Sequence, residues 1–212
     1  MEYGLIGEHL GHSYSREIHG QIADYEYELK ELRPDELDSF MRSKGFKAIN
    51  VTIPYKQDVI PYLDHISRQA AGIGAVNTIV NKDGVLWGDN TDFAGMAALA
   101  RRLDLELTGK KVLILGTGGT SKTALEVAKS LGAAQVYKVS RRADHTDADT
   151  DGIYQGTITY EEAVQLHKDA RIIINTTPAG MFPGVEGCAI DISAFPKYLI
   201  ASITKSPRTF SS

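Results

Sequence analysis

The sequence predicts an α/β fold in two domains. Strand patterns alternate with helix patterns along the 212 residues, which favours sheets covered by helices. The composition changes near residue 104, directly after a segment with helical apolar spacing. The new composition opens with a strand, a glycine turn and a helix in KKVLILGTGGTSKTALEVAKSLGA, the order of a dinucleotide-binding domain. We therefore expect an N-terminal domain over residues 1–92, a linking helix over 93–103 and a Rossmann-like domain over 104–212.

The elements of the first domain follow from apolar spacing and turn residues. Pro34 suits the first turn of a helix, and the Asp83-Gly84 pair suits a tight hairpin turn. NVTIPYK combines β-branched and apolar residues with a proline that ends the strand. In chain order we expect strand 3–7, helix 15–23, strand 27–32, helix 34–41, strand 50–53, a helical stretch around 59–63 and a hairpin around 82–84.

The second domain repeats a strand–helix order after the linking helix, in which Phe93, Met96, Leu99 and Leu103 recur at helical spacing. The segment ADHTDADTDG has no apolar periodicity and is expected to be a surface loop. In chain order we expect strand 112–115, a helix from about 120, strand 134–142, helix 160–170 and strand 171–177.

Composition excludes several classes of protein. A net charge of −4 and a pI near 5.9 argue against a nucleic-acid binder, which would usually carry a basic face. The single cysteine, Cys188, excludes an internal disulfide framework, and the histidines follow no metal-ligand spacing. The N-terminal segment does not resemble a signal peptide, and no apolar run approaches a membrane span. We expect a cytoplasmic protein without a bound metal.

The glycine turn of the second domain predicts a nucleotide cofactor. Gly116, Gly118 and Gly119 follow a strand, and Thr120 opens a helix, so the backbone can approach a pyrophosphate at a helix N-terminus. The next strand ends in Ser140-Arg141-Arg142, where an NAD-selecting domain would place an acidic residue for the ribose. Arginine can instead pair with a 2′-phosphate. The sequence therefore predicts NADP as the cofactor.

Polar residues at the strand ends of the first domain predict a substrate site. Ligands of open α/β sheets lie outside the carboxyl ends of the strands, and Lys56 follows the strand in NVTIPYK. Taken alone, each polar residue at these strand ends also has a structural explanation, such as helix capping by a serine or an aspartate. Together, a lysine, a carboxylate, amides and hydroxyls suit a small polyhydroxylated acid. The candidates are Ser13, Ser15, Lys56, Asn77, Asn90 and Asp92.

These motifs together resemble the shikimate dehydrogenase family. GLIG, HSYS, NVTIPYK, GAVNT, GDNTD, GTGGTSKTA, SRR and NTTPAGM occur in that family's order and spacing, from about residue 3 to 185. The resemblance implies an oxidoreductase that reversibly reduces 3-dehydroshikimate to shikimate with NADPH, a step of chorismate and aromatic amino-acid biosynthesis. It also implies that the first domain binds the substrate and carries the catalytic residues.

The resemblance also implies roles for individual residues. Lys56 would be the catalytic lysine, paired with Asp92, and could act as general acid in reduction and general base in oxidation. Ser13 and Ser15 would bind the substrate carboxylate, while Thr52, Asn77 and Asp92 would bind its ring hydroxyls. The cofactor residues would be Gly116, Gly118, Gly119 and Thr120 for the pyrophosphate, Ser140, Arg141 and Arg142 for the 2′-phosphate, and Thr176, Pro178 and Met181 near the nicotinamide.

The chain departs from the family pattern in its last part. The family continues after NTTPAGM with a D-x-x-Y-N-P strand, a glycine-rich turn and a further helix, whereas ASITKSPRT stands here and the sequence stops at Ser212. Arg16 also replaces the usual proline after the serines. We therefore expect a Rossmann-like domain that is incomplete, or truncated, at its C-terminal end. Two alternatives remain, a non-catalytic relative that binds shikimate or NADP, and a quinate/shikimate dehydrogenase. In each case we expect the protein to be a monomer or a homodimer.

Overall fold

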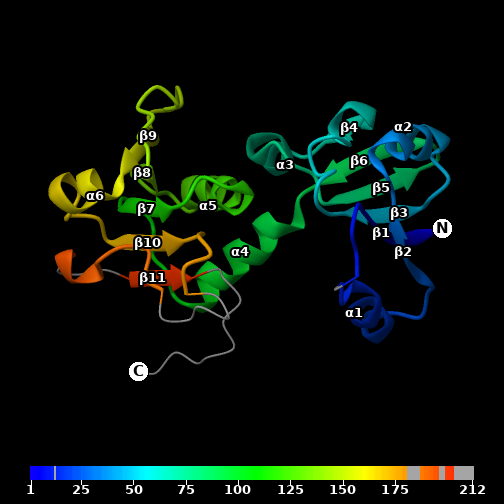
Figure 1. The fold of residues 1–212 in the computed structure, drawn as a ribbon, viewed down its shortest axis with the longest axis horizontal. Helices are drawn as coiled ribbons and strands as arrows, with labels where there is room; N and C mark the ends of the chain where they lie inside the picture. The colour runs from blue at the N-terminus through cyan, green and yellow to red at the C-terminus, as the bar shows by residue number, and fades with distance from the viewer. Residues whose placement is uncertain (12, 181–186, 196–198, 203–212) are drawn as a thin grey trace. The chain divides into compact units, whose positions relative to one another are not determined.

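The computed structural model describes residues 1–11, 13–180, 187–195 and 199–202 (Figure 1). The chain divides into two compact units, Met1–Ala94 and Gly95–Ser212, and the division falls inside helix α4 (Thr91–Arg102). Each unit contains its own sheet and its own buried apolar clusters. Among the described residues, no helix combines the length and the apolar character needed to cross a membrane.

The first unit is built on a six-stranded mixed sheet in the order β2-β1-β3-β5-β6-β4. Strands β2, β1 and β3 are parallel, whereas β5 pairs antiparallel with both β3 and β6. The elements are β1 (Tyr3–Gly7), α1 (Ser15–Ile22), β2 (Tyr27–Glu31), α2 (Pro34–Ser43), β3 (Ala48–Val51), a 3₁₀ turn (Ile60–Tyr62), β4 (His65–Ile66), α3 (Arg68–Ile73), β5 (Thr78–Lys82) and β6 (Val85–Asp89).

Helix α2 forms because its sequence supplies a start signal and one apolar face. Pro34 is its first residue, and the Glu36 carboxylate accepts a hydrogen bond from the backbone N–H of Arg33 at 2.8 Å. Leu37 and Met41, four positions apart, are buried in the main core of the unit. That core also contains Ile6, Phe46, Ile49, Tyr55, Val59, Ile79 and Leu86.

The second unit is built on a five-stranded sheet in the order β11-β10-β7-β8-β9, and all its pairs are parallel. Numbered along the chain this is the order 5-4-1-2-3, which is the doubly wound arrangement. Apolar runs such as Val112–Leu115 are buried, as expected for strands covered on both faces. The elements are β7 (Lys111–Leu115), α5 (Gly119–Ser130), β8 (Gln135–Ser140), β9 (Tyr154–Thr159), α6 (Tyr160–Leu166), β10 (Ile172–Asn175), a 3₁₀ turn (Ile192–Ala194) and β11 (Leu199–Ser202).

The predicted α/β fold is confirmed, but several predicted bounds are wrong. Strand β3 ends at Val51 instead of residue 53, because a turn closes with a hydrogen bond from the Tyr55 N–H to the Thr52 carbonyl at 3.0 Å. Ile53 is consequently 76% exposed. The helical stretch around 59–63 is only a short 3₁₀ turn, and α6 ends at Leu166. Strands β4, β9 and β11 and helix α3 were not predicted from the sequence.

Candidate functional site

The first unit contains a cavity of about 590 Å³ at the carboxyl ends of its central strands. Its walls come from the segment after β1, from α1, from the end of β3 and the turn after it, and from the residue before β5. This is the edge at which open α/β sheets bind ligands. Five residues predicted for the substrate line it together, namely Ser13, Ser15, Thr52, Lys56 and Asn77.

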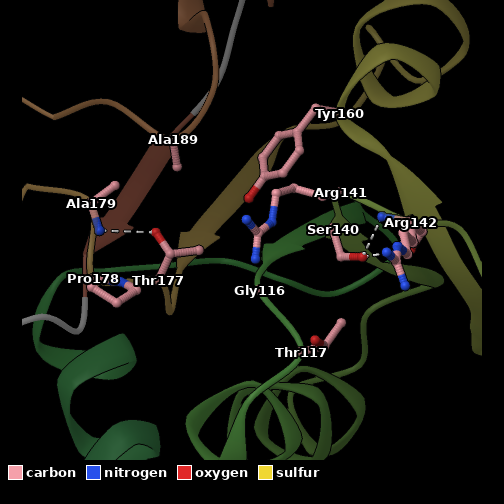
Figure 2. A pocket seen from close by; sticks show the side chains of 10 residues that line it. All are labelled: Gly116, Thr117, Ser140, Arg141, Arg142, Tyr160, Thr177, Pro178, Ala179 and Ala189. Atoms are coloured by element: carbon pink, nitrogen blue, oxygen red, sulfur yellow. Dashed lines mark hydrogen bonds between the residues drawn. The ribbon is translucent and has the colours of Figure 1, made fainter.

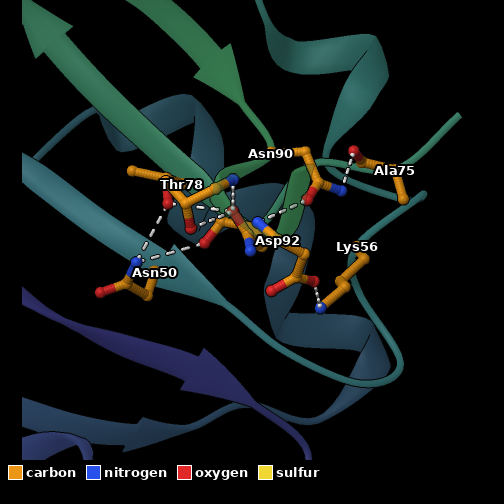
Figure 3. A network of polar contacts seen from close by, with 8 residues as sticks. Asn50, Lys56, Ala75, Thr78, Asn90 and Asp92 are labelled. Atoms are coloured by element: carbon orange, nitrogen blue, oxygen red, sulfur yellow. Dashed lines mark hydrogen bonds and ion pairs between the residues drawn. The ribbon is translucent and has the colours of Figure 1, made fainter. Parts of the chain in front are cut away.

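Lys56 and Asp92 form an ion pair at this site. The ammonium Nζ lies 3.0 Å from the Asp92 carboxylate Oδ2, and the two side chains point toward one another in Figure 3. Both remain accessible, with 31% of the Lys56 and 53% of the Asp92 side chain exposed. Such accessible ion pairs add little to folding stability, and this one leaves the ammonium accessible at the cavity that Lys56 lines.

One backbone hydrogen bond and two that involve the Asn90 side chain hold the two partners of this pair in place. The Val76 N–H donates to the Lys56 carbonyl at 2.8 Å, which ties the turn carrying the lysine to the segment before β5. The buried Asn90 donates from Nδ2 to the neighbouring Ala75 carbonyl at 2.9 Å. Asn90 Oδ1 in turn accepts from the Asp92 N–H at 3.1 Å, at the start of α4 (Figure 3). One two-residue segment, 75–76, therefore anchors both sides of the ion pair.

The side-chain amide of Asn77 has a fixed orientation. Its Oδ1 accepts hydrogen bonds from Thr78 Oγ1 at 3.0 Å, from the Thr91 N–H at 2.9 Å and from Thr91 Oγ1 at 3.2 Å. Asn50 Nδ2 donates to Thr78 Oγ1 at 3.1 Å and thereby extends this network (Figure 3). Since the oxygen of the Asn77 amide is used by three donors, its Nδ2 is the group that can donate to a ligand in the cavity.

The serines lie where the chain enters α1. Ser13 Oγ is 3.1 Å from Ser15 Oγ and accepts from the Ser15 N–H at 3.2 Å. The cavity wall continues one helical turn later at His19, a residue to which the sequence analysis gave no role. A spacing of four between Ser15 and His19 places both on one face of the helix, and this spacing is the signal that could have identified His19.

The second unit contains a cavity of about 1030 Å³ at the carboxyl ends of β7, β8 and β10 (Figure 2). Strand β7 lies between β8 and β10, so the chain order reverses there, which is where doubly wound sheets bind nucleotides. The lining residues are Gly116, Thr117, Ser140, Arg141, Arg142, Tyr160, Thr177, Pro178, Ala179 and Ala189.

The glycine turn fits a bound pyrophosphate. Gly116 has φ +103°, and a Cβ there would lie 3.1 Å from both Thr176 Oγ1 and Thr177 Cγ2, so a larger residue would be strained. In contrast, Cβ atoms built at Gly118 and Gly119 would meet no atom within 4 Å, which leaves space over the turn. Helix α5 begins at Gly119, so its free N–H groups and positive dipole end adjoin this space.

A short turn presents the two arginines. Ser140 Oγ donates to the Arg142 carbonyl at 2.5 Å and accepts from the Arg142 N–H at 3.1 Å (Figure 2). Both arginines are exposed, and neither forms an ion pair with a described residue. Tyr160 lies beside Arg141 in Figure 2; burial raises the pKa of its hydroxyl, and the charge of Arg141 opposes that rise. A cationic wall of this kind suits an anionic phosphate.

The remaining predicted residues take other positions. Gly118, Gly119, Thr120 and Thr176 belong to or adjoin the glycine turn without lining the cavity, and Thr176 Oγ1 donates to the Leu115 carbonyl at 2.6 Å. Met181 lies outside the described residues. Tyr160, Thr117 and Thr177 line the cavity although the sequence analysis did not select them. In the described part of the chain, no group of three or more His, Cys, Asp or Glu side chains could hold a metal ion.

Comparison with known proteins gives the same family for both units. Residues 5–79 match a family model described as the shikimate dehydrogenase substrate binding domain. The NADP(+)-dependent shikimate dehydrogenase of Clostridium beijerinckii is 39% identical over 197 residues, which cover 89% of this chain and 72% of that protein.

Solved structures agree with this sequence similarity. Shikimate dehydrogenase 1 of Peptoclostridium difficile is 32% identical, with a TM-score of 0.75 over 98% of this chain and 79% of that one. Shikimate 5-dehydrogenase of Listeria monocytogenes, solved in complex with shikimate and NAD, is 28% identical with a TM-score of 0.83 over 96% of this chain and 78% of that one.

Proposed function

The chain belongs to the shikimate dehydrogenase family, and from this premise we propose that it catalyses the reversible, NADP-dependent oxidation of shikimate to 3-dehydroshikimate. The observation that carries the proposal is the Lys56–Asp92 pair, 3.0 Å apart, at a cavity lined by hydroxyls and an oriented amide. A dehydrogenase of a hydroxy acid needs a group that moves the hydroxyl proton, and an accessible lysine with a fixed carboxylate partner meets that need.

The residues of the second unit support NADP as the cofactor. When bound, NADPH supplies the hydride that reduces the carbonyl carbon. The glycine turn and the start of α5 would hold its pyrophosphate, with open space above Gly118 and Gly119. Arg141 and Arg142 would pair with the 2′-phosphate, which distinguishes NADP from NAD. Pro178 and Thr176 follow β10, at the side expected to hold the nicotinamide.

The residues of the first unit would have separate roles in proton transfer and in substrate binding. In the reductive direction, Lys56 Nζ donates a proton to the oxygen that becomes the hydroxyl, and in oxidation it accepts that proton. Asp92 keeps the ammonium directed by its 3.0 Å contact. Ser13 and Ser15 would donate to the substrate carboxylate, while Thr52 and the Asn77 Nδ2 group would bind ring hydroxyls. These hydrogen bonds would orient the ring for transfer.

The test is the initial rate of NADP⁺ reduction by the pure protein, followed by absorbance, with shikimate and with quinate in parallel. We expect a shikimate-dependent rate well above background and a lower kcat/KM with quinate. Tight binding of shikimate and NADP⁺ by calorimetry without any reduction would contradict the proposal and favour a non-catalytic binding protein. A higher kcat/KM with quinate would instead identify the other hydroxy acid as the substrate.

A further inference from the structure

We propose that His19 is an additional binding residue for the substrate carboxylate, and that the aromatic pair Tyr25 and Tyr27 positions its ring. The proposal rests on the proposed function, because it assigns a group to the acid end of the same cavity. His19 lines that cavity one helical turn after Ser15. Among the described histidines, His19 combines a place in this cavity wall with a stacked ring and a side-chain hydrogen bond.

Two tyrosines fix the imidazole ring of His19. The ring stacks on Tyr27 with centroids 3.9 Å apart and an interplanar angle of 12°. Its Nδ1 is hydrogen-bonded to the hydroxyl of Tyr25, whose ring lies 4.9 Å from that of Tyr3. With one face covered and Nδ1 used, the nitrogen left for a ligand is Nε2. When the Tyr25 hydroxyl donates, the neutral ring carries its proton on Nε2 and so presents a donor.

Tyr27 joins this ring to the remainder of the cavity wall. Its hydroxyl donates to Asn50 Oδ1 at 2.7 Å, and Asn50 also lines the cavity. Burial, with a smaller contribution from Tyr25, raises the pKa of the Tyr27 hydroxyl to about 12, so this hydroxyl keeps its proton as a donor. The stacked ring and the Asn50 amide are therefore held by one buried side chain.

The charges around the cavity favour a hydrogen bond from His19 to the substrate carboxylate. Of the described lining residues, only Lys56, His9 and His19 can carry a positive charge. Lys56 is paired with Asp92, and the exposed His9 has no stacking or side-chain hydrogen-bond partner among the described contacts. Ser13 and Ser15 offer only neutral hydroxyls. An N–H from an imidazole one turn beyond Ser15 can add a stronger, charge-assisted hydrogen bond to the same acid group.

The test compares shikimate with its neutral methyl ester in wild type and in His19→Phe, which keeps a stacking ring but removes both nitrogens. We expect the KM for shikimate to rise roughly 10- to 100-fold in the variant. The KM for the ester should rise much less, while kcat and the KM for NADP⁺ should stay nearly unchanged, because the contact is the same in ground and transition states. His19→Gln, which restores an N–H near the Nε2 position, should recover most of the shikimate affinity.

His65→Phe is the matched control, since His65 also stacks on an aromatic ring, Trp87, with centroids 4.0 Å apart, but does not line the cavity. This control variant should leave kcat and the KM values for shikimate, its methyl ester and NADP⁺ unchanged. Equal rises in KM for acid and ester in His19→Phe, or an unchanged KM for shikimate, would overturn the carboxylate contact while leaving the proposed function intact. If wild type neither binds nor oxidises shikimate, the proposed function fails and this inference fails with it.

Discussion

Lys56→Ala is expected to lower kcat for shikimate-dependent NADP⁺ reduction by roughly a thousandfold, within the range usual for loss of a general acid–base group. The variant removes the only ammonium among the described residues that line the substrate cavity. Asp92→Asn should have a smaller effect, on the order of tenfold, because the lysine remains but loses the carboxylate 3.0 Å away. Steady-state kinetics with both substrates varied will separate kcat from KM.

Lys47→Ala provides the matched control for this experiment. Lys47 pairs with Glu2, also at 3.0 Å, at an exposed position that does not line the cavity. The control should keep wild-type kcat, since the removal of an exposed ion pair has little effect on folding. A Lys56→Ala enzyme that retains kcat within about twofold of wild type, with an intact fold by circular dichroism, would exclude Lys56 as the proton-transfer group.

The double variant Arg141→Ala/Arg142→Ala is expected to raise the KM for NADP⁺ by roughly a hundredfold or more and to change the KM for NAD⁺ little. Charge-assisted hydrogen bonds to phosphate contribute about 1.5–3 kcal/mol each, and NAD⁺ lacks the 2′-phosphate. Both arginines line the nucleotide cavity and form no ion pair with a described residue. The loss should therefore appear as a change of cofactor preference, measured as the ratio of kcat/KM values.

Arg101→Ala/Arg102→Ala is the corresponding control, because it removes an equal charge from an exposed pair in the last turn of α4. Its cofactor preference should equal that of wild type. If kcat/KM falls equally for NADP⁺ and NAD⁺ in the Arg141/Arg142 variant, these residues support the structure of the turn after β8 and do not recognise the 2′-phosphate.

The sequence was informative where one continuous segment carries both a structural signal and a chemical group. The strand, glycine turn and helix around Gly116 lie together in the chain, and the structure forms them as predicted. Lys56 and Asp92 are 36 positions apart, and no local pattern joins them. Their pairing was expected only because the motifs around each resemble one family, and the structure brings them to 3.0 Å.

Some residues that line the cavities were not predicted from the sequence. They reach the cavities through contacts between separate segments, and such contacts produce no pattern in the local sequence. Tyr160 reaches the nucleotide cavity because β9 pairs with β8 and places Thr159 opposite Ser140, so that the next residue lies beside Arg141. Strand β9 itself was missed because Gly156, with φ +110°, interrupts its apolar pattern. Helical spacing places His19 one turn after Ser15, but its ring contacts come from Tyr25 and Tyr27, which lie outside α1 and which that spacing does not show.

The most direct test of the proposed activity uses shikimate labelled with deuterium at the carbinol carbon that is oxidised. Pure protein, labelled shikimate and NADP⁺ are incubated, and the reduced cofactor is analysed by mass spectrometry. If the chain transfers hydride directly between substrate and cofactor, the NADPH formed will carry the deuterium, and the Lys56→Ala enzyme will form far less of it. Absence of reduced cofactor, or NADPH without the label, would contradict the assignment of this chain as a working shikimate dehydrogenase.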